Sequence, residues 1–199
     1  SVTTDRRPLI AAHQADWITA RLTGIAGISD WHNCLKLGYD PARGSWPEWL
    51  TRLAPGRIRL PEVLPPGTVI APISGMIAAA TGLPRNLQVV AGTTDSTASA
   101  VAAGARHPGD SITCLGSTLV LKIVSQRRID VPELGVYSHR YGNHWLVGGA
   151  SNSGGAVLRK YFTDAEIGRL RSRLTPDEST GLDYYPLAAP GERFPIRDP

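Results

Sequence analysis

The chain has 199 residues, of which 42% are hydrophobic and 19% are charged, so it can bury a folded core and is neither a disordered tail nor a fibrous repeat. Its 21 basic and 17 acidic residues give a net charge of +4, but the basic residues stand in scattered pairs, which indicates a solvated surface and excludes a nucleic-acid groove. Cys34 and Cys114 lie far apart without CxxC spacing, so they indicate neither a disulfide framework nor a structural zinc site, and a reducing compartment fits best.

The first half of the chain is predicted to be rich in helices. Apolar residues recur at helical spacing from Leu9 to Leu22, and Gly24 can end this helix in a left-handed turn. A short helix is expected over residues 47–53. Prolines 55, 61, 65, 66 and 72 predict a surface connection with little regular structure between them.

A strand and a helix of small residues follow. A helix over residues 75–81 leads to residues 87–92, an apolar, β-branched run short enough to be a buried strand. Residues 96–103 are almost all small, which favours a helix packed close to a neighbour and ended by Gly104. Because Pro84 and Asp95 interrupt the nearly uncharged stretch over residues 75–105, this stretch is not a membrane span.

Strands dominate from about residue 106 onward. Four are expected, over residues 111–115, 118–124, 135–140 and 144–149, with a hairpin turn at residues 141–143. Two helices close the pattern, over residues 153–161 and 164–173, and the second begins with Thr163 and Glu166 at capping-box spacing. The change from a helix-rich sequence to one dominated by strands near residue 106 predicts two α/β units, residues 1–105 and 106–199.

Asp95 is the first candidate for chemistry. It stands where the predicted buried strand gives way to a helix, the edge of an α/β sheet at which ligands bind. Helix amides would keep its carboxylate ionised, so that it could accept the proton of a hydroxyl attacking a phosphorus atom. The alternative is an ordinary helix N-cap, a commoner use of Asp at such a position.

Two glycine-containing turns are candidates for phosphate binding. Gly116, Ser117 and Thr118 lie between two predicted strands, where a tight hairpin tip can cradle phosphate oxygens or simply be a turn. Gly154 and Gly155 begin a helix, where they allow a nucleotide to approach the backbone or merely permit close packing. The second turn lacks the glycine spacing of a Rossmann fingerprint or a P-loop.

The histidines and tryptophans give weaker signals. The five histidines show no metal-binding pairing, so no metal ligand is predicted. Trp31 and His32, flanked by Asp30 and Asn33, either face a polar ligand or anchor a loop.

Several segments form a recognisable series in chain order: Ala15-Asp16-Trp17-Ile18, Ser29-Asp30-Trp31-His32-Asn33, Leu60-Pro61-Glu62-Val63, Thr81-Gly82-Leu83-Pro84, Gly92-Thr93-Thr94-Asp95, Leu115-Gly116-Ser117-Thr118 and Gly191-Glu192-Arg193-Phe194-Pro195. This series resembles the FGGY carbohydrate kinases, most closely the ribulokinase or xylulokinase-like branch.

The resemblance implies an α/β, actin-like (ribonuclease H-like) pair of domains with ATP and a sugar between them. Asp95 matches the catalytic base, which also hydrogen-bonds the sugar hydroxyl. Gly116, Ser117 and Thr118 match the phosphate hairpin, and Gly154 and Gly155 match the glycine pair near the nucleotide. Mg²⁺ would be held through phosphates and water. The resemblance also implies a cytoplasmic enzyme that binds a sugar and ATP and that binds neither nucleic acid nor a membrane. A homodimer is one arrangement expected of the full-length enzyme.

The chain departs from the family pattern in two places. It lacks the opening Asp-x-Gly-Thr phosphate strand and the late glycine-rich adenine segment. We therefore interpret residues 1–105 as the C-terminal part of the first, sugar-side domain and residues 106–199 as the N-terminal part of the second, nucleotide-side domain. This fragment is expected to be inactive alone. The full-length enzyme is expected to phosphorylate a ketopentose such as D-ribulose or D-xylulose. One alternative is a non-catalytic binding or regulatory protein that is a relic of a sugar kinase. The other is an actin-like ATPase without a sugar substrate.

Overall fold

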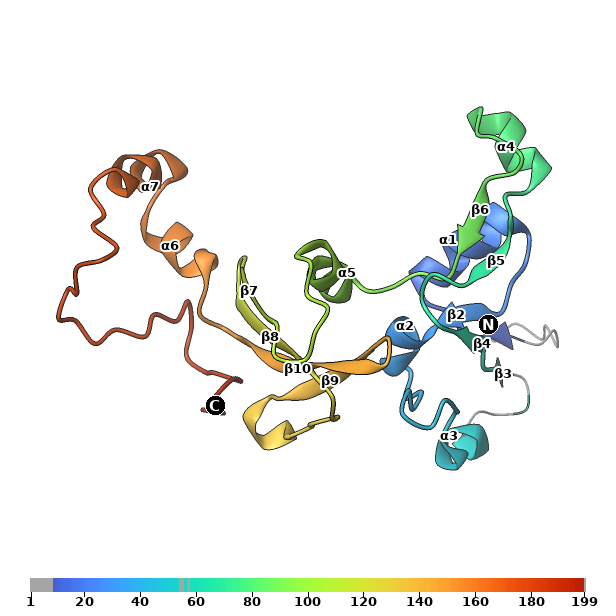
Figure 1. Cartoon of the computed structure of the whole chain (residues 1–199), viewed down its shortest axis with the longest axis horizontal. Helices are drawn as coiled ribbons and strands as arrows, with labels where there is room; N and C mark the ends of the chain where they lie inside the picture. Colours follow the sequence, from blue (N-terminus) through green and yellow to red (C-terminus); the bar gives the residue numbers. More distant parts are fainter. Residues whose placement is uncertain (1–8, 54–55, 57, 199) are drawn as a thin grey trace, which may run out of the picture. The chain divides into compact units, whose positions relative to one another are not determined.

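A computed structural model of the protein describes residues 9–53, 56 and 58–198 (Figure 1). The chain forms two compact units that divide between Ala98 and Ser99, within helix α5 (Asp95–Ala102). The assignment of residues 1–105 and 106–199 to parts of two domains stays a prediction. Among the helices of the described ranges, none has the length and apolar character needed to cross a bilayer.

The first unit is built from short helices and strands. In chain order these are β1 (Leu9–Ile10), α1 (Gln14–Thr23), β2 (Ile28–Asp30), α2 (Trp31–Leu35), α3 (Glu48–Leu53), β3 (Ile58–Arg59), β4 (Glu62–Leu64), β5 (Val69–Pro72), α4 (Gly75–Thr81) and β6 (Gln88–Val90). Strand β1 pairs with β3 and β2 with β4, both in parallel, whereas β5 and β6 are antiparallel. The predicted helices over residues 47–53 and 75–81 are confirmed, the first with its start at Glu48.

The helix predicted from Leu9 starts later than the apolar spacing indicated. Leu9 and Ile10 form β1, and α1 begins at Gln14, where the Asp16 carboxylate accepts the His13 N–H at 2.7 Å. Pairing with β3 gives Leu9 and Ile10 backbone partners that the helical pattern could not reveal. The predicted end is confirmed, because Gly24 adopts a left-handed conformation with a φ of 82°.

The proline-rich connection is more regular than predicted. Three short strands, β3, β4 and β5, lie between residues 58 and 72, so the expectation of little regular structure is wrong there. Pro61 precedes β4, Pro65 follows it and Pro72 ends β5, positions where a missing N–H interrupts no interior ladder bond. Pro55 lies outside the described residues.

The strand expected to be buried over residues 87–92 is only half buried. It shortens to β6, which pairs with β5 in a two-stranded sheet, where Val89 is buried and Val90 is 44% exposed. Val89 packs with Ile73 and Ala78, so one face of β6 contributes to the core of this unit.

The second unit is built around a four-stranded antiparallel sheet in the order β7-β8-β10-β9 (Figure 1). Its elements are β7 (Ser111–Leu115), β8 (Leu119–Ser125), the 3-10 helix η1 (Pro132–Leu134), β9 (Tyr137–Tyr141), β10 (His144–Ser151), α6 (Gly155–Tyr161) and α7 (Asp164–Arg171). Ala100 of α5 and Ala105 pack on Val124 and Leu146 of the sheet, which confirms the close approach expected of a small-residue helix.

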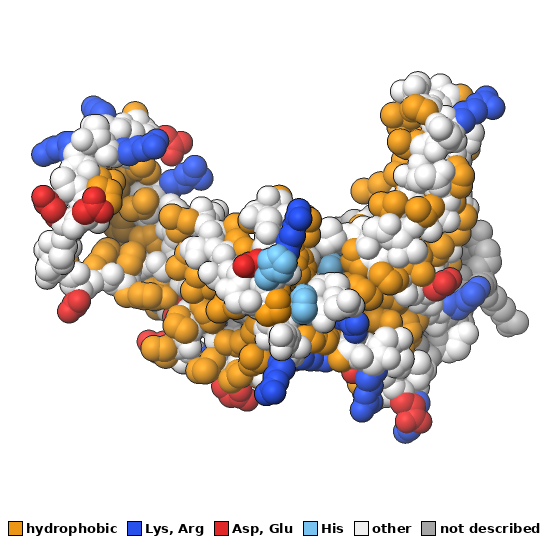
Figure 2. All heavy atoms as spheres, viewed as in Figure 1, with side chains coloured by type: hydrophobic (Ala, Val, Ile, Leu, Met, Phe, Trp, Pro, Cys, Tyr) orange, Lys and Arg blue, Asp and Glu red, His pale blue; other side chains and the backbone are white. Residues whose placement is uncertain are grey.

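The turn and cap signals of this unit are also confirmed. Tyr141 pairs with His144 across the predicted hairpin turn, and Thr163 and Glu166 form the predicted capping box of α7. The face drawn in Figure 2 carries Lys and Arg side chains in small groups separated by hydrophobic and uncharged ones, as expected from their scattered pairs in the sequence.

Candidate active site

Asp95 is the first residue of α5, close behind the carboxyl end of β6. Its side chain is exposed, and the Ser96 N–H donates to its Oδ1 at 2.7 Å. The N-cap position belongs to Thr94, because the Thr94 carbonyl accepts the Ala98 N–H at 2.9 Å and the Thr94 hydroxyl lies 3.2 Å from that of Thr97. The capping interpretation of Asp95 is therefore wrong, and its carboxylate stands beside the helix N-terminus facing solvent.

The segment over residues 30–33 lies against the residues that lead to Asp95. The His32 Nδ1 and the Thr93 Oγ1 are 2.8 Å apart, and the Trp31 indole N–H donates to the His32 Nε2 at 3.1 Å. Because Nε2 accepts, a neutral His32 carries its proton on Nδ1 and donates it to Thr93. Buried His32 thus has a fixed tautomer, and the Thr93 hydroxyl is left to donate its own proton elsewhere.

Asp30 fixes this segment in place. Its buried carboxylate accepts the backbone N–H of His32 at 2.8 Å and of Asn33 at 3.0 Å, and the Asn33 side-chain amide at 2.6 Å. A Cβ at Gly92 would lie 3.6 Å from the Asp30 Oδ2, so the two segments touch here as well. These contacts support the loop-anchor interpretation of Trp31 and His32: Asp30 and Asn33 hold the segment, and His32 connects it to Thr93. No local motif could have revealed this pairing, which spans 61 residues.

In the second unit the structure brings the two predicted phosphate elements together. The Gly155 N–H donates to the Gly116 carbonyl at 2.8 Å, the Ala156 N–H to the Ser117 carbonyl at 3.3 Å, and the Leu119 N–H to the Ser153 carbonyl at 2.7 Å. A Cβ at Gly154 would lie only 2.6 Å from the Ser117 carbonyl oxygen. The hairpin tip and the glycine turn are therefore joined backbone to backbone, an approach that a side chain at Gly154 would block.

This junction determines which amides remain for a ligand. The Gly116 N–H closes the hairpin by donating to the Thr118 carbonyl at 3.0 Å, and the Gly155 N–H is used in the junction. Within the described part of the chain, no hydrogen bond uses the N–H of Ser117, Thr118 or Gly154. These three N–H groups, with the hydroxyls of Ser117 and Thr118, are the donors available to an anion.

A pocket of about 480 Å³ opens beside the junction. It is lined by Leu115, Gly116, Ser117, Gly155, Leu158, Arg159, Asp164 and Ile167. Arg159 lies 3.4 Å from Asp164 in an ion pair that is largely exposed. The pocket thus combines apolar walls, a backbone turn and the Arg159–Asp164 ion pair, which suits a ligand with an apolar ring and a polar end. Arg159 was not singled out in the sequence, since an exposed helical arginine carries no signal of its own.

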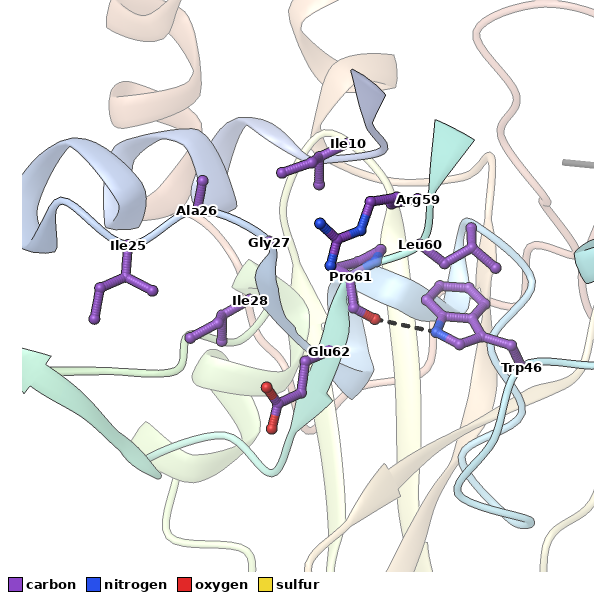
Figure 3. A pocket seen from close by; sticks show the side chains of 10 residues that line it. All are labelled: Ile10, Ile25, Ala26, Gly27, Ile28, Trp46, Arg59, Leu60, Pro61 and Glu62. Atoms are coloured by element: carbon purple, nitrogen blue, oxygen red, sulfur yellow. Dashed lines mark hydrogen bonds between the residues drawn. The ribbon is translucent and has the colours of Figure 1, made fainter. Parts of the chain in front are cut away.

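A second pocket, of about 450 Å³, lies in the first unit (Figure 3). Isoleucines 10, 25 and 28 contribute to its wall, together with Arg59 and Glu62, and the Trp46 indole N–H donates to the Pro61 carbonyl at 3.1 Å. None of the predicted site residues lines this pocket.

Metal ligands do not gather in the described ranges: no group there of three or more His, Cys, Asp or Glu side chains is placed to hold a metal ion. Of the predicted site residues, Asp95 belongs to the first unit and Gly116, Ser117, Thr118, Gly154 and Gly155 to the second.

No protein-family model matches the chain, but solved structures of carbohydrate kinases do. Xylulose kinase from Rhodospirillum rubrum aligns with 79% of the chain at 27% identity and a TM-score of 0.68. Ligand-bound xylulose kinase from Lactobacillus acidophilus aligns with 92% at 22% identity and a TM-score of 0.75. Plasmodium falciparum glycerol kinase with ADP aligns with 82% at 13% identity and a TM-score of 0.64.

The chain spans 34% to 39% of the length of these three structures. The resemblance to the FGGY carbohydrate kinases and the expected α/β, actin-like fold are confirmed.

Proposed function

Because the chain has the fold of part of an FGGY carbohydrate kinase, we propose that it is the middle portion of an ATP-dependent kinase that transfers the γ-phosphoryl group to a hydroxyl of a ketopentose such as D-ribulose or D-xylulose. The observation that carries the proposal is the junction of the hairpin tip with the Gly154–Gly155 turn beside a pocket of about 480 Å³. A cytoplasmic location and inactivity of this portion alone belong to the same proposal.

Asp95 is proposed as the general base. Its exposed carboxylate can accept the proton of the sugar hydroxyl while the hydroxyl oxygen attacks the γ-phosphorus atom. The Asp95–Ser96 contact and the Thr94 cap fix the backbone from which the carboxylate projects, so that it meets the hydroxyl in a limited range of directions.

The phosphate chain of ATP is proposed to lie at the hairpin. The N–H groups of Ser117, Thr118 and Gly154 and the two hydroxyls supply donors for phosphate oxygens. In the adjoining pocket, which Ser117 also lines, the guanidinium of Arg159 can exchange its exposed ion pair with Asp164 for a phosphate oxygen. Gly116 and Gly155 act by close backbone approach, since their own N–H groups bond within the junction. Mg²⁺ would neutralise charge on the phosphates and would be held through phosphate oxygens and water.

The first test replaces the proposed base in the full-length kinase. Asp95→Asn should lower phosphoryl transfer by at least about 100-fold, because general-base catalysis contributes on that order, while ADP binding stays within about twofold. Asp110→Asn is the matched control, since Asp110 is an exposed carboxylate that accepts two backbone N–H groups at 2.8 Å. Near-normal turnover of Asp95→Asn would remove Asp95 from the mechanism.

The second test asks which acceptor is used. ADP release should depend on an added sugar and be fastest with a ketopentose among ketopentoses, polyols and hexoses. Sugar-independent hydrolysis would favour an actin-like ATPase, and ATP binding without turnover would favour a binding or regulatory protein.

A further inference from the structure

The segment Gly191-Glu192-Arg193-Phe194-Pro195 is part of the family resemblance but has no role in the proposed reaction. Its acidic member, Glu192, is 8% exposed although it carries a carboxylate. A carboxylate removed from water must find donors within the protein. The donors around Glu192 therefore indicate what this segment does.

Both carboxylate oxygens of Glu192 are saturated with hydrogen bonds. The Oε1 accepts the backbone N–H of Asn152 at 2.8 Å and of Arg193 at 2.7 Å, with the Phe194 N–H at 3.3 Å. The Oε2 accepts the hydroxyls of Ser151 and Tyr185, each at 2.6 Å. Tyr185, Arg193 and Phe194 are within seven residues of Glu192 in the chain. Ser151 and Asn152, in contrast, lie at the end of β10, about forty residues earlier.

The electrostatics agree with a permanent charge on this group. Burial alone would raise the pKa of Glu192, but the hydrogen bonds from Ser151, Tyr185 and the backbone outweigh it and lower the pKa to about 2. Glu192 is therefore a carboxylate at any physiological pH.

Further contacts hold the same segment along β10. The Asn152 side chain donates to the Gly191 carbonyl at 2.9 Å, and the Arg193 Nε donates to the Ala150 carbonyl at 2.7 Å. The Phe194 ring lies where a side chain at Gly149 would stand, so this glycine makes room for it. The position of Glu192 is thus fixed from several directions.

From Ser151 the hydrogen bonds continue to the phosphate elements. The Ser151 hydroxyl donates to Glu192 and accepts the Ser153 N–H at 2.9 Å, and the Ser153 carbonyl in turn accepts the Leu119 N–H at 2.7 Å. Leu119 follows the hairpin tip directly, and Gly154 follows Ser153. The Ser151 hydroxyl and the backbone of Ser153 therefore link Glu192 to both sides of the junction, the hairpin tip and the Gly154–Gly155 turn.

We propose that Glu192 is a positioning residue for the phosphate-binding junction: through Ser151 and Asn152 it holds the turn before Gly154 at the place where it meets the hairpin tip. This inference rests on the proposed function, which supplies the nucleotide. In this role Glu192 acts through Ser151 and Asn152 on the geometry of the amides that are proposed to bind phosphate.

Amide hydrogen exchange tests the geometry without any assumption about activity. In Glu192→Gln and Ser151→Ala, exchange protection of the Leu119 and Gly155 amides should fall by about tenfold or more, because hydrogen bonds to a charged group contribute enough for such a change. Protection of the core amides around Leu146 should stay within about threefold. Tyr185→Phe keeps the Ser151–Glu192 bond and should lower protection at Leu119 and Gly155 by less than about threefold.

Asp110→Asn is the matched control for a lost carboxylate. Asp110 accepts the N–H groups of Arg106 and His107 at the opposite end of β7 from the hairpin tip, so exchange should change there and not at Leu119 or Gly155. Wild-type protection of the Leu119 and Gly155 amides in Glu192→Gln would overturn the inference. An equal loss of protection throughout the sheet would also overturn it, because it would mean a general structural role.

Kinetics of the full-length kinase then separate this inference from the proposed function. Glu192→Gln should raise the KM for ATP about tenfold and leave the KM for the sugar unchanged. A wild-type protein that binds no ADP and phosphorylates no sugar would refute the proposed function and leave the exchange result standing. An active wild type whose Glu192→Gln variant has unchanged KM for ATP would refute the positioning role.

Discussion

The closest backbone approach at the candidate site leads to a quantitative prediction for Gly154→Ala. The new Cβ would lie 2.6 Å from the Ser117 carbonyl oxygen, 2.7 Å from the Thr118 Cα and 2.8 Å from the Thr118 carbonyl carbon. All three atoms are backbone, so no side chain can rotate to relieve the contact. Gly154 has a φ of 164°, an extended conformation open to alanine, so the effect of the substitution is steric.

The size of the effect follows from the required displacement. Ordinary contact begins at 3.4 Å, so the hairpin and the turn must separate by about 0.8 Å. That movement would stretch the 2.8 Å bond between the Gly155 N–H and the Gly116 carbonyl beyond good hydrogen-bonding distance. We expect Gly154→Ala to lower the free energy of unfolding by about 1–3 kcal/mol and to raise the KM for ATP by about tenfold or more.

Denaturant unfolding and ATP titration of the proposed full-length kinase measure the two effects. Gly168→Ala is the matched control, because Gly168 lies within α7 and a Cβ there meets no atom within 4 Å. It should raise the free energy of unfolding by up to about 1 kcal/mol through helix propensity and leave ATP binding unchanged. Wild-type stability and ATP affinity in Gly154→Ala would show that the junction is not as tight as described, and would refute the reasoning.

Three further predictions concern buried polar groups. Lys122 is 3% exposed, and burial lowers its pKa to about 8, which means that the charged form is destabilised in the folded protein. Lys122→Met removes this buried charge, so we expect it to raise the free energy of unfolding at pH 7, measured by denaturant unfolding, by up to about 3 kcal/mol. Between pH 8 and 10.5 Lys122 keeps its proton in the unfolded chain but loses it in the folded protein. The free energy of unfolding should therefore rise with pH in this range, and it should rise more steeply in the wild type than in Lys122→Met. The same slope of unfolding free energy against pH in both proteins would contradict this. Thr93→Val removes the 2.8 Å contact between the Thr93 hydroxyl and the His32 Nδ1 and should lower the free energy of unfolding by about 0.5–1.5 kcal/mol, the net contribution of one hydrogen bond, and an unchanged free energy of unfolding would contradict a stabilising role for this contact.

Local signals in the sequence predicted much of the second unit. The hairpin at Gly142, the capping box of Thr163 and Glu166 and the strands of the four-stranded sheet follow from turn and cap chemistry within a few residues. The ends of α1 and α4 were also set locally, by left-handed glycines at residues 24 and 82.

The first unit was less predictable, because its strands are short and paired over long distances. Two-residue strands such as β1 and β3 carry no periodicity, and only their pairing with each other distinguishes Leu9 and Ile10 from the start of a helix. The half exposure of β6 likewise depends on its pairing with β5 alone.

The sequence by itself determined which residues are suited to the chemistry: an acidic residue after a strand, a hairpin tip with two hydroxyls, and a glycine pair at the start of a helix. Only the tertiary structure decided how they are used. It joined the Gly155 N–H to the Gly116 carbonyl and bonded the Ser151 hydroxyl to the Glu192 carboxylate. Spacing along a chain reports bonds within one or two turns, whereas these contacts join residues about 40 apart, and their distances are fixed by the packing of whole strands and turns.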